Sequence, residues 1–274
     1  MQNNIHNKLS IATFEKNPIK RGFFKFLERL IGVTTVDQIY CESKIQDKDE
    51  NWWSSALRVL NIDVDIKYLN NIEVPEKESL IVVCNHPYGI TDGILLGKIL
   101  SFYRDDYMFL ANEALQKIPE ICERIIPLEL NTLDKKEKSN NISAIRRAHS
   151  HLTDGGALVI FPGGEVSSSS GIFNTPVDSK WSSLPVKLSK SFNCPILPVY
   201  IHGRSSYLFQ LVTKISFSLR KYFLFREVLK NRNKTINVTI NDLHNLNDYN
   251  SKFNDVDLSN EIYETMKRDS KYLS

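Results

Sequence analysis

The chain has 274 residues, of which 42% are hydrophobic and 24% charged, the composition of an ordinary globular protein with a full core. Its formal net charge of +3 does not by itself point to a nucleic-acid partner, and we expect none. Four widely spaced cysteines without a C-x-x-C pair favour buried thiols in a reducing compartment. No N-terminal stretch has the apolar core of a signal peptide, and no run reaches the roughly 20 apolar residues that span a bilayer.

Helical and strand patterns then alternate along the chain. A helical pattern runs from Asn17 to Gly32, a short helix is expected at 51–60, and 63–69 alternates as a strand does. Further strands are expected near 79–84, 107–111, 125–130, 156–161, 195–201 and 235–240, and helices near 92–103, 112–121, 140–153, 182–193, 206–212, 218–231 and 255–271. This alternation predicts an α/β fold, a mainly parallel central sheet covered by helices, with amphipathic helices at the N-terminus. We expect residues 1–60 to form a helical region and 61–274 the α/β domain.

The first chemical motif follows an apolar run that ends at Cys84. Asn85-His86-Pro87 comes next, and Asp92 opens the following amphipathic segment. Ligands bind at the carboxyl ends of strands in α/β sheets. A histidine there titrates near neutral pH, and a nearby carboxylate can fix its tautomer and raise its basicity. A structural alternative is that Asp92 simply caps the helix.

The second motif follows the apolar run 157–161 and reads Pro162-Gly163-Gly164-Glu165-Val166-Ser167. Two glycines after a buried strand allow the backbone to approach a ligand closely. Glu165 is then expected at the same edge of the sheet as His86, either in contact with substrate or held by backbone amides. Arg204 follows a third predicted strand, where its guanidinium could bind a phosphate.

Together these motifs resemble the glycerolipid acyltransferase superfamily, which includes enzymes that make phosphatidic acid from lysophosphatidic acid. The family pairs a histidine and an aspartate that are separated by four residues with a Phe-Pro-Glu-Gly-Thr-Arg-Ser block. Here five residues separate His86 from Asp92, Gly163 replaces the block's acid and Val166 its arginine. Both departures resemble a bacterial branch described as hemolysin-like or lyso-ornithine-lipid acyltransferase-like. The resemblance spans about residues 40–240 and makes 61–274 an acyltransferase domain.

The resemblance implies transfer of a fatty acyl group from acyl-CoA or acyl carrier protein to a hydroxyl of a lysophospholipid or lysophosphatidic acid. His86 would be the general base and Asp92 its orienting partner. Backbone amides at Gly163 and Gly164, or the Asn85 side chain, would stabilise the oxyanion. The remaining substrate-binding residues expected from the motifs are Glu165, Ser167 and Arg204. We expect no cofactor besides the donor, and no metal, because no spacing offers the three protein ligands of catalytic zinc.

Positive charge is concentrated in two stretches. Residues 15–30 hold five basic residues against two acids, and 214–234 hold seven against Glu227 alone. Phenylalanines interleave with these cations, as in helices that lie on anionic membranes. We therefore expect a cytoplasmic protein held peripherally on the inner face of the membrane, although core-packed helices with a solvated face fit residues 218–231 nearly as well.

Three alternatives stay open. The same chemistry could act on a lyso-aminolipid such as lyso-ornithine lipid. The absence of the arginine that the family has at the position of Val166 favours this alternative. His86 could instead activate water in a thioester hydrolase, although no G-x-S-x-G elbow is present. A non-catalytic lipid-binding protein is the third alternative.

Overall fold

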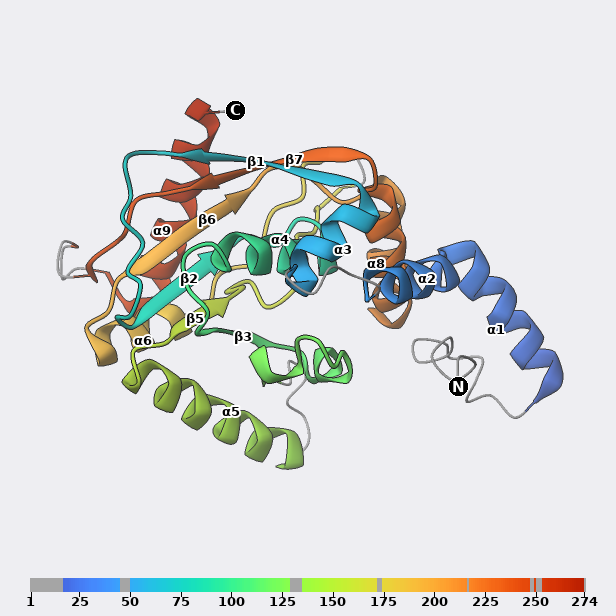
Figure 1. Ribbon diagram of the computed structural model, residues 1–274, viewed down its shortest axis with the longest axis horizontal. Coiled ribbons are helices and arrows are strands. Elements are labelled where there is room, and N and C mark those ends of the chain that lie inside the picture. The colour runs from blue at the N-terminus through green and yellow to red at the C-terminus, as the bar shows by residue number, and fades with distance from the viewer. Residues whose placement is uncertain are drawn as a thin grey trace.

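The computed structural model describes residues 17–44, 50–128, 135–171, 174–215, 217–246, 249 and 253–273. A single seven-stranded sheet in the order β1-β7-β6-β2-β5-β3-β4 forms its centre (Figure 1). Every neighbouring pair is parallel except β6 and β7. The strands are β1 Ile62–Tyr68, β2 Leu80–Cys84, β3 Tyr107–Ala111, β4 Ile125–Pro127, β5 Ala157–Ile160, β6 Ile196–Ile201 and β7 Lys234–Ile240. The predicted α/β fold with a mainly parallel sheet is confirmed.

Helices cover both faces of the sheet. They are α1 Pro18–Ile31, α2 Val33–Ser43, α3 Trp52–Leu60, α4 Ile90–Leu100, α5 Lys135–Thr153, α6 Leu184–Phe192, α7 Tyr207–Ile215, α8 Phe217–Lys230 and α9 Asp255–Ser270. Alternate residues of β2 enter different cores, since successive strand side chains point to opposite faces. Val82 lies in the core formed with α3, α4 and α8, whereas Val83 lies in the core formed with α5, α6 and α9.

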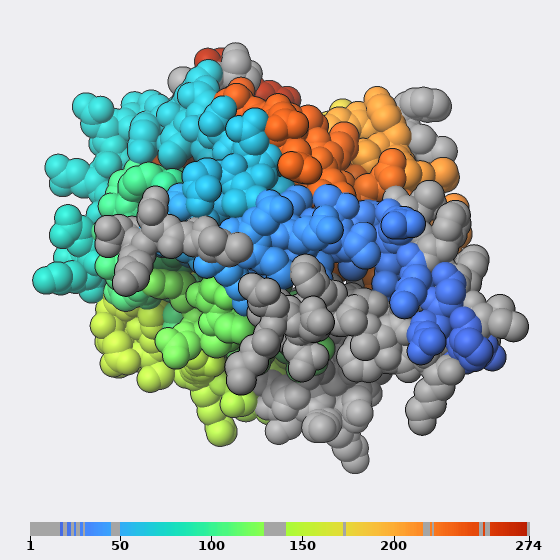
Figure 2. Space-filling view, turned by 45° about the vertical axis from the view of Figure 1, so that its right-hand side comes forward, coloured from blue at the N-terminus to red at the C-terminus, as the bar shows by residue number. Residues whose placement is uncertain are grey.

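The N-terminal region differs from the prediction of one helix. Gly32 has φ +86°, a conformation that glycine adopts without strain, and it separates α1 from α2. A Cβ at this position would lie 2.3 Å from Cδ1 of Leu229. Both helices contact α8, and Figure 2 shows the blue N-terminal helices against orange residues near 230. The division of the chain at residue 60 stays a prediction.

The helix predicted at 112–121 is wrong. This segment forms two short 3₁₀ turns, η1 Glu113–Lys117 and η2 Cys122–Arg124. Pro119 lies between them, and proline lacks the amide hydrogen that a helix interior needs. The strand expected at 125–130 ends at Pro127, and residues 129–130 lie outside the described part of the chain.

Candidate active site

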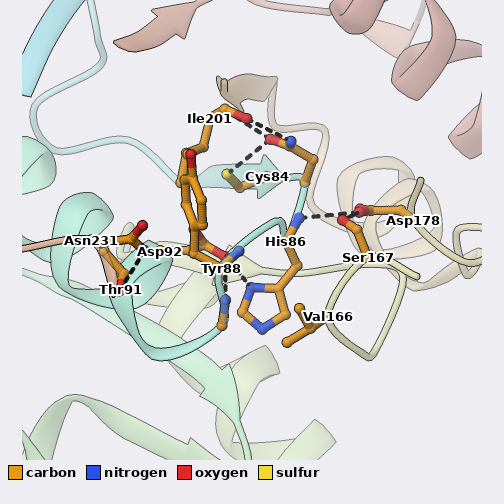
Figure 3. Close-up of polar contacts among 12 residues, drawn as sticks. Cys84, His86, Tyr88, Thr91, Asp92, Val166, Ser167, Asp178, Ile201 and Asn231 are labelled. Atoms are coloured by element: carbon orange, nitrogen blue, oxygen red, sulfur yellow. Dashed lines mark hydrogen bonds and ion pairs between the residues drawn. The ribbon is translucent and has the colours of Figure 1, made fainter. Parts of the chain in front are cut away.

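His86 and Asp92 come together at the carboxyl end of β2. Nδ1 of His86 lies 2.9 Å from Oδ2 of Asp92 (Figure 3). The other imidazole nitrogen points away from the carboxylate (Figure 3), and 19% of the histidine side chain is exposed. The ring also packs on Phe161, with centroids 4.1 Å apart. The arrangement leaves one nitrogen accessible while a carboxylate orients the other, as a general base requires.

Asp92 is fully buried in the first turn of α4. The helix begins at Ile90, two residues earlier than predicted, and Oδ2 of Asp92 accepts hydrogen bonds from the amides of Tyr88 (2.9 Å) and Gly89 (2.8 Å). Burial raises the pKa of the carboxyl, while His86 and the two amides act in the opposite direction. Gly89 is the N-cap of the helix, and Asp92 at the third helical position completes the capping box while it faces the histidine.

The second motif lies directly beside the first. The backbone amide of Ser167 donates to the carbonyl of His86 at 2.8 Å. The Ser167 hydroxyl donates to Asp178, and the His86 amide donates to the same oxygen at 3.2 Å (Figure 3). Ser167 is buried, so the structure gives its hydroxyl a positioning contact rather than the substrate contact we expected.

Asp178 links the two motifs, although it belongs to neither of them. Besides His86 and Ser167, its carboxylate accepts a hydrogen bond from Nε1 of Trp181 at 3.0 Å. The side chain is buried, and three donors satisfy it, as a buried charge requires. Asp178 lies on the loop that follows the glycine-rich turn, and no local motif in that loop pointed to it.

The prediction for Asn85 needs correction. Its Nδ2 donates to the carbonyl of Ile201 at 2.9 Å, and its Oδ1 accepts from the amide of Ile201 at 2.7 Å. Both halves of the amide are therefore used in joining the ends of β2 and β6. The side chain is buried, and the structure gives it a role in joining these strands.

The two glycines differ in what they offer. Gly164 has φ +71°, and its amide closes a turn by donating to the carbonyl of Phe161 at 2.9 Å. The amide of Gly163 makes no hydrogen bond to any residue that the structure describes. Of the two, Gly163 is the one with a free donor for an oxyanion.

Glu165 is held by side chains rather than by backbone amides. Its carboxylate accepts from Ser179 Oγ at 2.6 Å and from Arg220 Nη1 at 2.5 Å. Burial alone would raise its pKa, but these two donors hold the pKa below its ordinary value. Arg220 comes from α8, is buried, and also donates to the carbonyl of Val166. The second motif has Val166 where the family has an arginine. A guanidinium nevertheless reaches this motif from Arg220, 54 positions later in the chain.

Arg204 lies beyond the end of β6. Its guanidinium packs on the ring of Tyr207 at 4.2 Å from the centroid, and its Nη2 is buried without a hydrogen bond to a described residue. Tyr88 connects this region to the histidine motif, because its hydroxyl donates to the carbonyl of His202 at 3.1 Å. Gly203 permits that contact, since a Cβ there would lie 1.6 Å from the tyrosine oxygen.

Two further features of the described residues bear on the chemistry. They contain no group of three or more histidine, cysteine, aspartate or glutamate side chains suited to a metal ion. Across these same ranges, no helix has both the length and the apolar character of a membrane span.

Comparison with known proteins now gives the family. Residues 65–202, half of the chain, match the acyltransferase family. The chain belongs to that family. Two lyso-glycine lipid O-acyltransferases are similar to it. The protein from Phocaeicola vulgatus is 28% identical over 193 residues, covering 68% of this chain and 66% of the relative, just under two thirds. The protein from Bacteroides thetaiotaomicron is 24% identical over 230 residues, covering 81% and 80%.

A solved structure supports the fold. The 1-acyl-sn-glycerophosphate acyltransferase PlsC from Thermotoga maritima matches with a TM-score of 0.50 over 96% of this chain and 86% of that one, at 18% identity. Membership of the acyltransferase family, expected from the two motifs, is confirmed. The roles of the individual site residues stay predictions.

Proposed function

We propose that this acyltransferase moves a fatty acyl group from an acyl thioester to a hydroxyl of a lysolipid. The observation that carries the proposal is the contact of 2.9 Å between His86 Nδ1 and a buried Asp92. The carboxylate favours a proton on Nδ1 and leaves the lone pair of Nε2 free for the acceptor hydroxyl. The thioester donor would be the single co-substrate, either acyl-CoA or acyl carrier protein.

In the proposed reaction Nε2 of His86 takes the proton from the acceptor hydroxyl as its oxygen attacks the thioester carbonyl. The amide of Gly163 donates to the oxyanion of the tetrahedral intermediate. The carbon–sulfur bond then breaks, the carbonyl re-forms, and the departing thiolate takes the proton from the imidazolium. Asp92 stabilises that imidazolium throughout. The substrate hydroxyl is the nucleophile, so no covalent enzyme intermediate is required.

For the acceptor we propose a lysolipid with an amino-acid headgroup ahead of lysophosphatidic acid. Both curated relatives are described as lyso-glycine lipid O-acyltransferases, and Val166 stands where the wider family has the arginine of its block. A glycine joined to a lipid through its nitrogen keeps a carboxylate. Arg204 is the candidate partner for that carboxylate, because its buried Nη2 has no hydrogen bond to a described residue and guanidinium pairs with carboxylates in a planar fork.

The test is an acyl-transfer assay of the purified protein, with products identified by mass spectrometry. Lysophosphatidic acid, a lyso-glycine lipid and a lyso-ornithine lipid are each combined with acyl-CoA and with acyl carrier protein. We expect transfer to an amino-acid lysolipid to be fastest. Faster transfer to lysophosphatidic acid would overturn the acceptor assignment but not the reaction. Equal thioester cleavage with and without acceptor would identify a hydrolase and overturn both.

A further inference from the structure

Helix α7 presents an unusual outer face. Ten large apolar side chains are exposed among the residues whose side chains the structure describes, and four of them lie on this nine-residue helix. They are Tyr207, Leu208, Leu211 and Ile215. The spacing of 207, 211 and 215 is four residues, so these three share one side of the helix. We call the four residues the α7 stripe.

The inner face of the same helix contacts the segment of the second motif. Gln210 is buried, and its Oε1 accepts from the amide of Ser169 at 2.9 Å while its Nε2 donates to the carbonyl of Ser167 at 3.0 Å. Ser167 in turn donates its amide to the carbonyl of His86. The α7 stripe therefore lies on the reverse side of the element that supports the second motif.

Cations lie beside the stripe. Lys214 lies on α7 itself and is exposed, and Arg204 packs on Tyr207 at the helix start. The adjoining α8 adds the exposed Lys230, which lies near enough to Arg204 for their charges to interact. Burial, together with the nearby Lys234 and Arg204, lowers the pKa of Lys230 against the opposing effect of Glu227. Apolar side chains bordered by cations are the pattern of a helix that lies in the interface of an anionic bilayer.

We propose that α7 docks the protein on an anionic lipid surface, with the α7 stripe inserted among the lipids and the neighbouring cations at the headgroups. A second copy of this chain fits less well, since isologous contact would place like charges opposite one another. Four side chains also provide much less than the roughly 800 Å² per partner of a stable protein interface. This docking goes beyond the proposed function, although its purpose rests on that function. A docked enzyme could take its lysolipid acceptor from the lipid surface next to the active site.

The experiment compares Leu211→Ser/Ile215→Ser with wild type in flotation on vesicles of phosphatidylglycerol and phosphatidylcholine. Leu211 is 39% and Ile215 70% exposed, so the double variant should fold normally, which circular dichroism checks. We expect its partition coefficient to fall about tenfold or more, since each aliphatic side chain contributes substantially to transfer from water. Ile142→Ser is the matched control. Ile142 is 57% exposed on α5, which packs on the opposite face of the sheet from α8 (Figure 1), and it should bind like wild type.

Turnover with a short-chain lysolipid below its micelle concentration separates this inference from the proposed function. The double variant should keep wild-type turnover on the monomeric acceptor and lose it on vesicle-borne acceptor. Unchanged flotation of the double variant would overturn the docking inference even if transfer is normal. Loss of flotation in both the double variant and Ile142→Ser would equally overturn it, because the effect would not be specific to α7. A wild type that dimerises while failing to bind vesicles would assign the stripe to a second copy instead.

Discussion

Asp92 serves two purposes that one substitution can separate. In Asp92→Asn, the remaining carbonyl oxygen can still accept from the amides of Tyr88 and Gly89, because asparagine caps helices about as well as aspartate. The same oxygen also faces His86 Nδ1, so the ring keeps its partner but loses the negative charge that stabilises the imidazolium. We expect transfer to fall by about 10²–10⁴. Steady-state kinetics check this, and an Asp92→Asn protein with full activity would show that Asp92 is a cap alone.

The same variant should gain stability relative to wild type as the pH rises. Burial raises the pKa of Asp92 in the folded protein, so between the unfolded value of about 3.9 and the folded one the native state binds more protons. Wild-type stability therefore falls as the pH rises through that window, while the variant has no carboxyl at this position to titrate. Thermal unfolding at pH 4 and pH 7 measures the difference in Tm between the two proteins. A Tm of Asp92→Asn that falls relative to that of wild type between pH 4 and pH 7 would contradict this explanation.

Asp92→Ala loses the hydrogen bonds to both amides, so its free energy of unfolding should be lower than that of wild type by about 0.5–2 kcal/mol.

Arg204 should affect binding of the acceptor more than the chemical step. Its guanidinium packs on Tyr207 and has a buried nitrogen without a hydrogen bond to a described residue, and removing a ground-state contact raises KM with little change in kcat. We expect Arg204→Ala to raise KM for the lysolipid and not for the thioester. Arg204→Lys should restore binding in part, since lysine keeps the charge but not the planar fork. Kinetics in which each substrate is varied separately decide the point, and an unchanged KM for both substrates would remove Arg204 from the site.

At the scale of elements, Arg220 fastens α8 to the glycine-rich turn. Its buried guanidinium donates to Glu165 and to the carbonyl of Val166. Arg220→Gln should lower the free energy of unfolding by about 1–3 kcal/mol, since a buried acceptor loses its charged donor. Arg232→Gln, at an exposed position just past the end of the same helix, is the control and should change little. Urea denaturation of the three proteins measures the effect, and equal losses in both variants would show that the contact itself has no special role.

The contribution of this pair should also depend on pH. The pKa of Glu165 is held below its ordinary value, so the stabilisation is present above the unfolded value of about 4.3 and is lost as the pH falls through the folded value. The stability gap between wild type and Arg220→Gln should therefore narrow below about pH 4. A gap that stays constant down to pH 3 would indicate that the carboxylate is not involved.

Local sequence patterns predicted the elements that hold the site but not all the contacts within it. The apolar run of β2 and the turn at His86 are short-range signals, and the strand and the motif were placed correctly. The helix expected at 112–121 does not form, because Pro119 lacks the amide hydrogen that a helix interior needs. Asp178 and Arg220 reach the site from distant segments, and only the packing of α8 and the loop after β5 brings them there. Asn85 was misassigned because its backbone partner, Ile201, lies on another strand.

Across the whole molecule, cations gather around α8. On α1 the exposed residues Arg21, Lys25 and Arg29 recur every four positions, and α1 contacts α8. We expect Arg21→Gln/Lys25→Gln/Arg29→Gln to weaken binding to anionic vesicles, since each cation near such a surface contributes about 1 kcal/mol. The effect should fade in high salt, which screens surface charges. Flotation with anionic and neutral vesicles measures the fraction of protein bound to each. Equal fractions of wild type bound to both would show that charge attraction does not contribute to binding.

Transfer by a histidine base is the central claim, and turnover of purified His86→Ala tests it most directly. The assay uses the acceptor and donor that give the highest wild-type rate, with circular dichroism and thermal unfolding to show that the variant is folded. We predict a rate lower by about 10²–10⁴, the usual loss when a general base is removed, with KM for both substrates little changed. A folded His86→Ala protein that retains more than half of the wild-type rate would contradict the account.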